Sequence, residues 1–104
     1  MSFREELPGG ELAGCKTQHD RKVRKIAAAY WERGFDVRAD LPEYQSPKPI
    51  RGKIADVVAK KGKKTIIVEV ETPESFGRDR NQRGILSDYA KSKPRTTFRW
   101  TRTR

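Results

Sequence analysis

Residues 54–71 read I-A-D-V-V-A-K-K-G-K-K-T-I-I-V-E-V-E, two runs rich in valine and isoleucine around a short glycine-containing turn. β-Branched residues favour strands, and glycine readily adopts the positive φ angles of tight hairpin turns. The pattern therefore predicts a β-hairpin with strands at 54–60 and 64–71. Side chains along a strand alternate between two faces, so Glu69 and Glu71 point the same way.

The turn of this hairpin decides whether a third acid joins them. If Gly62 and Lys63 are the turn residues, Asp56 on the first strand lies directly opposite Glu69 and on the same face. A register shifted by one residue would send the acids to opposite faces, so convergence requires registers of one parity. We predict that parity, in which Asp56, Glu69 and Glu71 meet.

Three carboxylates on one face need positive charge nearby, because opposed like charges destabilise a sheet. Lysine and arginine side chains are one source of that charge. A divalent cation is the other, since a carboxylate cluster with open positions is a natural magnesium site. The residues by themselves leave both alternatives open.

The overall charge indicates a polyanionic partner. The 104 residues suffice for one domain with a modest core, and they carry a net charge of +10. Residues 78–104 hold nine basic and two acidic residues. Cys15 is the single cysteine, which excludes an internal disulfide and a cysteine-based zinc site. There is no apolar run of the ~20 residues that a membrane span needs, and no signal-peptide pattern, so we expect a cytoplasmic protein with no membrane partner.

The rest of the chain predicts a single α/β domain at 17–104 after a flexible arm at 1–16. Apolar residues at helical spacing follow Thr17, and Gly34 is a natural helix stop. The predicted elements are, in order, a helix from Thr17 to Gly34, strands at 35–38, 54–60 and 64–71, a helix that starts between 74 and 80 and runs to about 91, and a strand over 96–104. This order predicts a small mixed sheet flanked by helices.

The hairpin, G-K-I-A-D-V-V-A-K-K-G-K-K-T-I-I-V-E-V-E, resembles the core motif of the PD-(D/E)XK nuclease superfamily. That motif places an aspartate on the first strand of a hairpin, and an acid, any residue and usually a lysine on the second. The predicted order of elements is similar to the αβββαβ core of the restriction-endonuclease-like fold. The preceding stretch, H-D-R-K-V-R-K-I-A-A-A-Y-W-E-R-G-F-D-V, resembles the opening of archaeal Holliday-junction resolvases. The similarity covers residues 17 to 100.

This resemblance implies a Mg²⁺-dependent endonuclease, with Mn²⁺ as a substitute, that hydrolyses phosphodiester bonds of DNA. Asp56 and Glu69, with the backbone carbonyl of Val70, would hold the cation. Glu71 replaces the usual lysine, and some restriction enzymes with Glu-x-Glu are active, so Glu71 would be a general base or a further metal contact. Branched or junction DNA is the substrate that the resemblance favours, and a homodimer is the implied assembly.

Other residues have a functional and a structural interpretation. His19 would take the place of a first-helix acid and touch water or phosphate, or would merely pack on the helix that it starts. Gln82 resembles a glutamine of several superfamily branches, or is an exposed helix residue. Phe98 and Trp100 alternate as core residues do, although they could also stack on bases. The residues expected to bind nucleic acid are Arg78, Arg80, Arg83, Gln82, Lys53 and Arg51, and the arginines at 78, 80 and 83 contact phosphate or lie on a solvated helix face. Arg51 and Lys53 precede the Asp56 strand and could instead supply the positive charge that the acids need.

Two other functions compete with the nuclease. The first is a nuclease-fold module that binds nucleic acid without cutting it, which the replacement of the lysine by Glu71 favours. The second is a basic RNA-associated or ribosomal protein, a class that usually lacks a valine-rich hairpin bearing acids.

Overall fold

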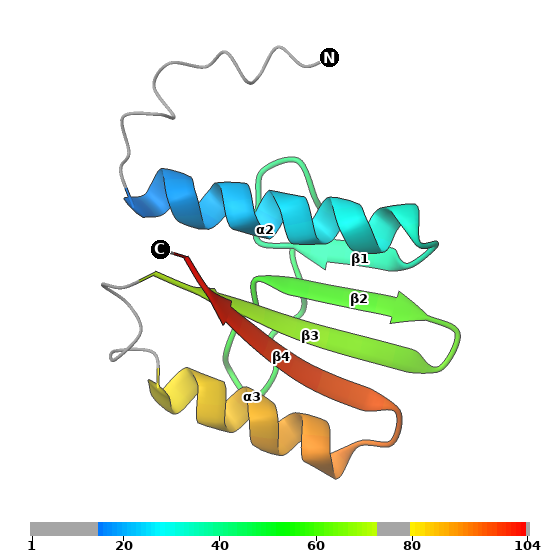
Figure 1. Cartoon of the computed structure of the whole chain (residues 1–104). Coiled ribbons are helices and arrows are strands. Elements are labelled where there is room, and N and C mark those ends of the chain that lie inside the picture. The colour runs from blue at the N-terminus through cyan, green and yellow to red at the C-terminus, as the bar shows by residue number, and fades with distance from the viewer. Residues whose placement is uncertain (1–14, 73–79, 104) are drawn as a thin grey trace.

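The computed structural model describes residues 15–72 and 80–103, which form an α/β domain (Figure 1). Its elements are α2 (Cys15–Glu32), β1 (Asp36–Ala39), β2 (Val57–Lys61), β3 (Lys64–Glu71), α3 (Arg80–Ser92) and β4 (Thr96–Arg102). The predicted order of helix, three strands, helix and strand is confirmed. The first helix begins at Cys15, two residues earlier than predicted, and the rest of the predicted arm lies outside the described residues.

The described strands make one small mixed sheet in the order β1-β2-β3-β4. β2 runs antiparallel to β1 and β3, whereas β4 runs parallel to β3. Lys61 pairs with Lys64, and Gly62 in the turn has a φ of 61°. The predicted turn and the predicted parity are therefore confirmed.

The first hairpin strand begins at Val57 rather than at residue 54. The chain before it makes a tight turn in which Ile50 and Lys53 exchange two backbone hydrogen bonds. Arg51 and Gly52 at the centre of that turn have positive φ angles. Between this turn and Val57, Asp56 N–H donates to Glu69 Oε2 and Val70 N–H donates to Asp56 Oδ2. Side chains therefore bind backbone groups that a longer ladder would pair, and the ladder starts later than the apolar pattern suggested.

Helix α2 covers one face of the sheet with the predicted stripe. Val23, Ala27 and Tyr30 are buried there against β1, β2 and β3. The helix ends where Phe35 N–H donates to the Tyr30 carbonyl, 3.1 Å away, and Gly34 N–H donates to the carbonyl of Trp31. With a φ of 88° at Gly34, this is a Schellman motif, in which glycine is favoured because it has no Cβ.

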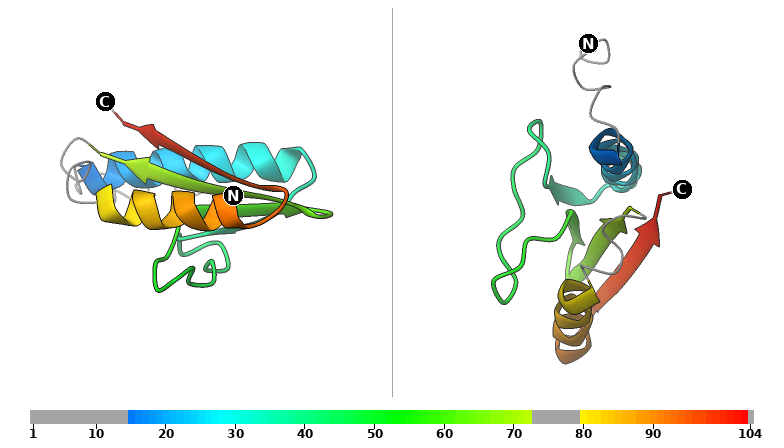
Figure 2. Two further views of the ribbon diagram at one scale, coloured as in Figure 1. Left: turned by 90° about the horizontal axis from the view of Figure 1, so that it is seen from below. Right: turned by 90° about the vertical axis from the view of Figure 1, so that its left-hand side faces the viewer.

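Helix α3 covers the opposite face over β3 and β4, so the sheet lies between the two helices (Figure 2). Leu86 of α3 packs there with Ile67 and Ala55, and all three are fully buried. Trp100 of β4 is 47% exposed, because β4 ends the described sheet and has a neighbour on one side only. The expectation that Trp100 belongs to the core is therefore wrong. Within the described residues, no helix has the length and apolar character needed to cross a bilayer.

Candidate functional site

The three acids of the hairpin lie together at one end of the sheet. Glu69 and Glu71 are at the end of β3, and Asp56 directly precedes β2. All three are buried, with relative exposures of 8% for Asp56, 3% for Glu69 and 0% for Glu71. They occupy the face of β3 that also carries Ile67, whereas Val68 and Val70 belong to the core beneath α2. The predicted sharing of a face is confirmed.

The backbones of the two strands hold the first two acids in place. Val70 N–H donates to Asp56 Oδ2 at 2.7 Å, and Asp56 N–H donates to Glu69 Oε2 at 3.2 Å. The regular ladder stops at the Val57–Val68 pair. Just beyond it, the backbone of each side of the hairpin binds a carboxylate of the other side. The N–H and C=O of an extended residue point to the same neighbouring strand, so the Val70 carbonyl faces the side of Asp56.

His19 reaches this cluster from α2. Its Nε2 lies 3.2 Å from Asp56 Oδ1, and its Nδ1 lies 3.2 Å from Asp20 Oδ1. The hydrogen bond to Asp56 raises the pKa of His19 to about 9, against a smaller opposing effect of burial. The ring is therefore an imidazolium at neutral pH, which donates from both nitrogens. His19 acts as a cation beside Asp56 and not as a base of ordinary pKa.

Gln82 reaches the cluster from α3, on the other side of the sheet. Its Nε2 donates to Glu69 Oε1 at 3.1 Å and to the Ile54 carbonyl at 3.2 Å. Burial raises the pKa of Glu69 to about 8, and the negative charge of Asp56 adds to the effect, while the hydrogen bond from Gln82 lowers it. A buried carboxyl beside a second one ionises late because the low dielectric strengthens their repulsion.

Arg83 of α3 is the cation beside the third acid, Glu71. Its Nη1 lies 3.8 Å from Glu71 Oε2, its guanidinium lies 5.4 Å from the centre of the Trp100 ring, and its side chain is 13% exposed. Arg83 is three residues before Leu86 and seven before Ala90, both of which are buried. This helical spacing predicts that the Arg83 side chain faces inward, and it is the feature of the sequence that could have identified Arg83.

The other basic candidates that the structure describes have different surroundings. The guanidinium of Arg51 lies 5.6 Å from the centre of the Tyr89 ring. Lys53 is held by its backbone in the tight turn with Ile50. Arg80 is exposed at the first residue of α3, and Arg78 lies outside the described residues. The cations that lie beside Asp56 and Glu71 are those of His19 and Arg83, whereas the guanidinium of Arg51 is directed at Tyr89.

Among the residues that the structure describes, no group of three or more His, Cys, Asp and Glu side chains is arranged as a metal site. The candidate oxygen donors are the carboxylates of Asp56 and Glu69, which backbone hydrogen bonds hold at the same point of the hairpin, with the Val70 carbonyl on the same side. Mg²⁺ is usually held by one or two carboxylates and keeps several waters. This donor set fits such an ion, and it needs no third acid.

Comparisons of the chain with known protein families, with curated proteins and with solved structures find no match. We therefore infer the function from the geometry of this cluster.

Proposed function

We propose that the chain is a metal-dependent endonuclease that hydrolyses phosphodiester bonds of DNA, with a restriction-endonuclease-like core of the PD-(D/E)XK type. The observation that carries the proposal is the pairing of Asp56 and Glu69. These buried acids come from neighbouring strands, and Asp56 N–H donates to Glu69 Oε2 at 3.2 Å. A module that only binds nucleic acid gains nothing from opposed carboxylates, which weaken its sheet.

Asp56, Glu69 and the Val70 carbonyl are the residues that would hold Mg²⁺, or Mn²⁺ in its place. When bound, the cation would lower the pKa of a coordinated water and offset the charge of the phosphate. Gln82 fixes the orientation of Glu69 through its 3.1 Å hydrogen bond, and His19 fixes that of Asp56 from the opposite side of the sheet. Such outer contacts orient ligand carboxylates and make their geometry reproducible.

Glu71 is the acid that remains for proton transfer. It lies two residues beyond Glu69 on the same face, where the superfamily motif usually has lysine. We assign it the role of accepting the proton of the attacking water. Arg83, 3.8 Å away, provides the positive charge that the lysine would have brought, and it enters from α3 instead of from β3.

The basic surface supports DNA as the substrate. With a net charge of +10, the protein should bind the phosphate backbone with an affinity that falls steeply as salt rises. Arg80, exposed at the start of α3, is one candidate for such a contact. The resemblance to resolvases extends the proposal to branched DNA and to a homodimer.

A nucleic-acid-binding module without catalysis is the second candidate. The ion pairs of His19 with Asp56 and of Arg83 with Glu71 favour it, because they offset two of the three acids without a metal. The two functions differ in whether the cluster has to bind a cation for the chain to act on DNA.

Incubation of the pure protein with linear, supercoiled and four-way-junction DNA separates these functions. We expect cleavage in Mg²⁺ or Mn²⁺ and none in a chelator. Asp56→Asn should abolish cleavage while DNA binding persists, since it leaves the basic surface intact. Asp88→Asn, which makes the same change at an exposed position of α3, should cut like the wild type. If neither cation supports cutting of any of these DNAs, the binding module is the better description.

A further inference from the structure

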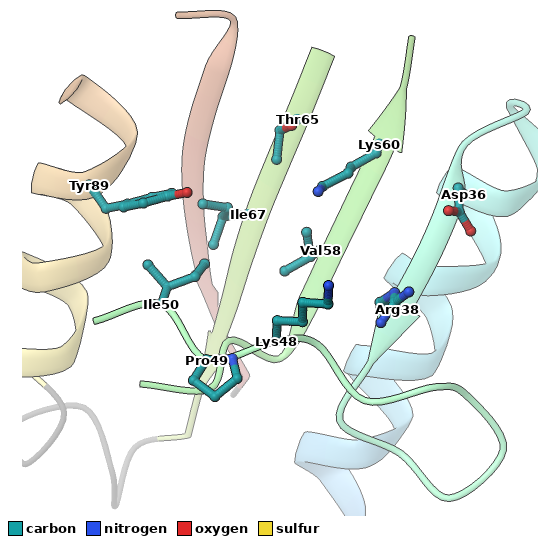
Figure 3. Close-up of a pocket in the computed structure, with 10 residues that line it drawn as sticks. All are labelled: Asp36, Arg38, Lys48, Pro49, Ile50, Val58, Lys60, Thr65, Ile67 and Tyr89. Atoms are coloured by element: carbon teal, nitrogen blue, oxygen red, sulfur yellow. The ribbon is translucent and has the colours of Figure 1, made fainter. Parts of the chain in front are cut away.

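A pocket lies on the face of the sheet that carries the acids, at the opposite end of the hairpin. Helix α3 packs over β3 and β4, and α2 covers the other face of β1 and β2, so part of this face is left open. The opening is about 340 Å³ in volume and is closed below by residues 48–50 of the loop that leads to β2 (Figure 3). Ligand pockets begin at roughly 300 Å³.

The pocket has two chemically different walls. One wall is basic and carries Arg38 of β1, Lys60 of β2 and Lys48 of the loop, with Lys48 and Lys60 directed into the opening in Figure 3. Asp36 is the one acid among the described lining residues. Several cations that meet with little opposing charge favour an anionic ligand, and a guanidinium fork matches phosphate oxygens in particular.

The other wall is apolar and carries an aromatic ring. Val58 and Ile67 form its floor, and the Tyr89 ring of α3 stands beside Ile50 (Figure 3). The Tyr89 hydroxyl is directed towards the strands, and Arg51 and Lys93 each lie 5.6 Å from the centre of its ring (Figure 3). A flat, weakly polar group such as a nucleobase therefore fits over the apolar floor, with its edge towards the Tyr89 hydroxyl. A ligand that satisfies both walls carries a ring and a phosphate a few ångströms apart.

We propose that this pocket binds one unpaired nucleotide of a DNA strand, with its base over Val58 and Ile67 beside the Tyr89 hydroxyl and its phosphate between Arg38 and Lys60. This inference rests on the proposed nuclease function and names its substrate as DNA with unpaired nucleotides close to the cut. A paired base cannot enter such a pocket, because enzymes reach a base only in a single strand or after it leaves the stack.

The spacing along β3 sets where the unpaired nucleotide lies. Ile67 and Thr65 line the pocket, and Glu69 follows them on the same face. Strand residues rise ~3.3 Å each, so the pocket is about 7–13 Å from Glu69 along the strand. Stacked nucleotides rise ~3.4 Å each, which places the occupant roughly two to four nucleotides from the bond that is cut.

The first test measures binding of a single nucleotide by NMR in a chelator, with the full chain. We expect deoxyadenosine monophosphate to shift the amide signals of Val58, Lys60 and Ile67, and deoxyadenosine or inorganic phosphate alone to shift them far less. Lys60→Glu should weaken the binding about tenfold, as expected for loss of a charged contact. Lys63→Glu makes the same charge change in the exposed hairpin turn and should leave it unchanged. Lys48→Glu repeats the test if Lys60→Glu does not fold.

The second test compares DNAs by fluorescence anisotropy, also in a chelator. A duplex with a single-stranded overhang of about four nucleotides, long enough to span the roughly two to four nucleotides between the pocket and Glu69, should bind more tightly than a blunt duplex. Lys60→Glu should remove this preference, and Lys63→Glu should weaken both DNAs equally.

Three outcomes would overturn the proposal: nucleotide-induced shifts that do not cluster at the pocket, equal losses in the two variants, or nucleotide binding without any preference for the overhang. The last outcome would leave a free nucleotide as the ligand. Neither assay requires cleavage. A pocket that does not bind nucleotide would therefore not contradict the nuclease proposal, and a protein that does not cleave DNA can still be tested for nucleotide binding.

Discussion

The free energy of unfolding of Glu69→Gln should rise relative to that of the wild type as the pH increases above about 5. Burial raises the pKa of Glu69 from 4.5 to about 8, so between these values the folded chain holds a proton that the unfolded chain has released. The free energy of unfolding then falls as the pH rises, by about 1.4 kcal/mol for each pH unit. Glutamine carries no proton to lose, so this contribution to the slope disappears.

His19 acts in the same direction at higher pH. Its pKa is raised from 6.5 to about 9 by Asp56, so its stabilising contribution is complete below about 6.5 and is lost as the pH rises through about 9. The interval from about pH 5 to 6.5 therefore isolates Glu69. Over that interval we expect its contribution to stability to fall by roughly 2 kcal/mol.

Urea denaturation followed by circular dichroism, repeated across this interval, measures the slope. The wild type and Glu32→Gln, which alters an exposed acid of α2, should share one slope, and Glu69→Gln should be flatter by the amount above. Changed hydrogen bonds in the variant shift its stability by a constant and leave the slope untouched. Equal slopes in all three proteins would contradict this prediction, because they would show that the folded state does not destabilise the ionised form of Glu69.

Three further substitutions test the packing around the site. Arg83→Gln removes a cation from beside the buried Glu71 and should cost ~3 kcal/mol of stability. Urea denaturation at neutral pH measures this loss, and a change below about 0.5 kcal/mol, the size of an exposed pair, would contradict the prediction. Leu86→Ala empties a fully buried position between α3 and the sheet and should cost about 2–5 kcal/mol, measured as a lowered thermal midpoint. Gly34→Ala places a Cβ at a φ of 88° and should cost about 1–2 kcal/mol, whereas Gly84→Ala, in α3 with open space around it, should not destabilise.

The hairpin and its acids were predictable because they depend on short-range rules. The turn around Gly62 sets the pairing of Lys61 with Lys64, and the alternation of side chains then determines the face of each acid. His19 lies four residues before Val23, and helical spacing places two such side chains on the same face of α2, towards the sheet. These inferences need no knowledge of how distant segments pack.

The charges around the acids were harder to predict, because they depend on where a helix docks. Nothing in the local pattern shows that α3 directs Arg83 at Glu71, or that the loop turns Arg51 away to Tyr89. The exposure of Trp100 has a similar cause. Alternation along a strand indicates two faces, but it does not tell a strand with neighbours on both sides from one at the edge of the described sheet.

The cluster draws on all three layers of the domain, since the hairpin carries the acids, α2 brings His19 and α3 brings Gln82. In a hairpin formed alone the acids are in water, which screens their repulsion. Each helix that docks removes water from the acids and brings a partner in exchange. A state with one helix docked therefore buries the acids without all of their partners, so it is less favourable than the complete domain, and this should sharpen the cooperativity of folding.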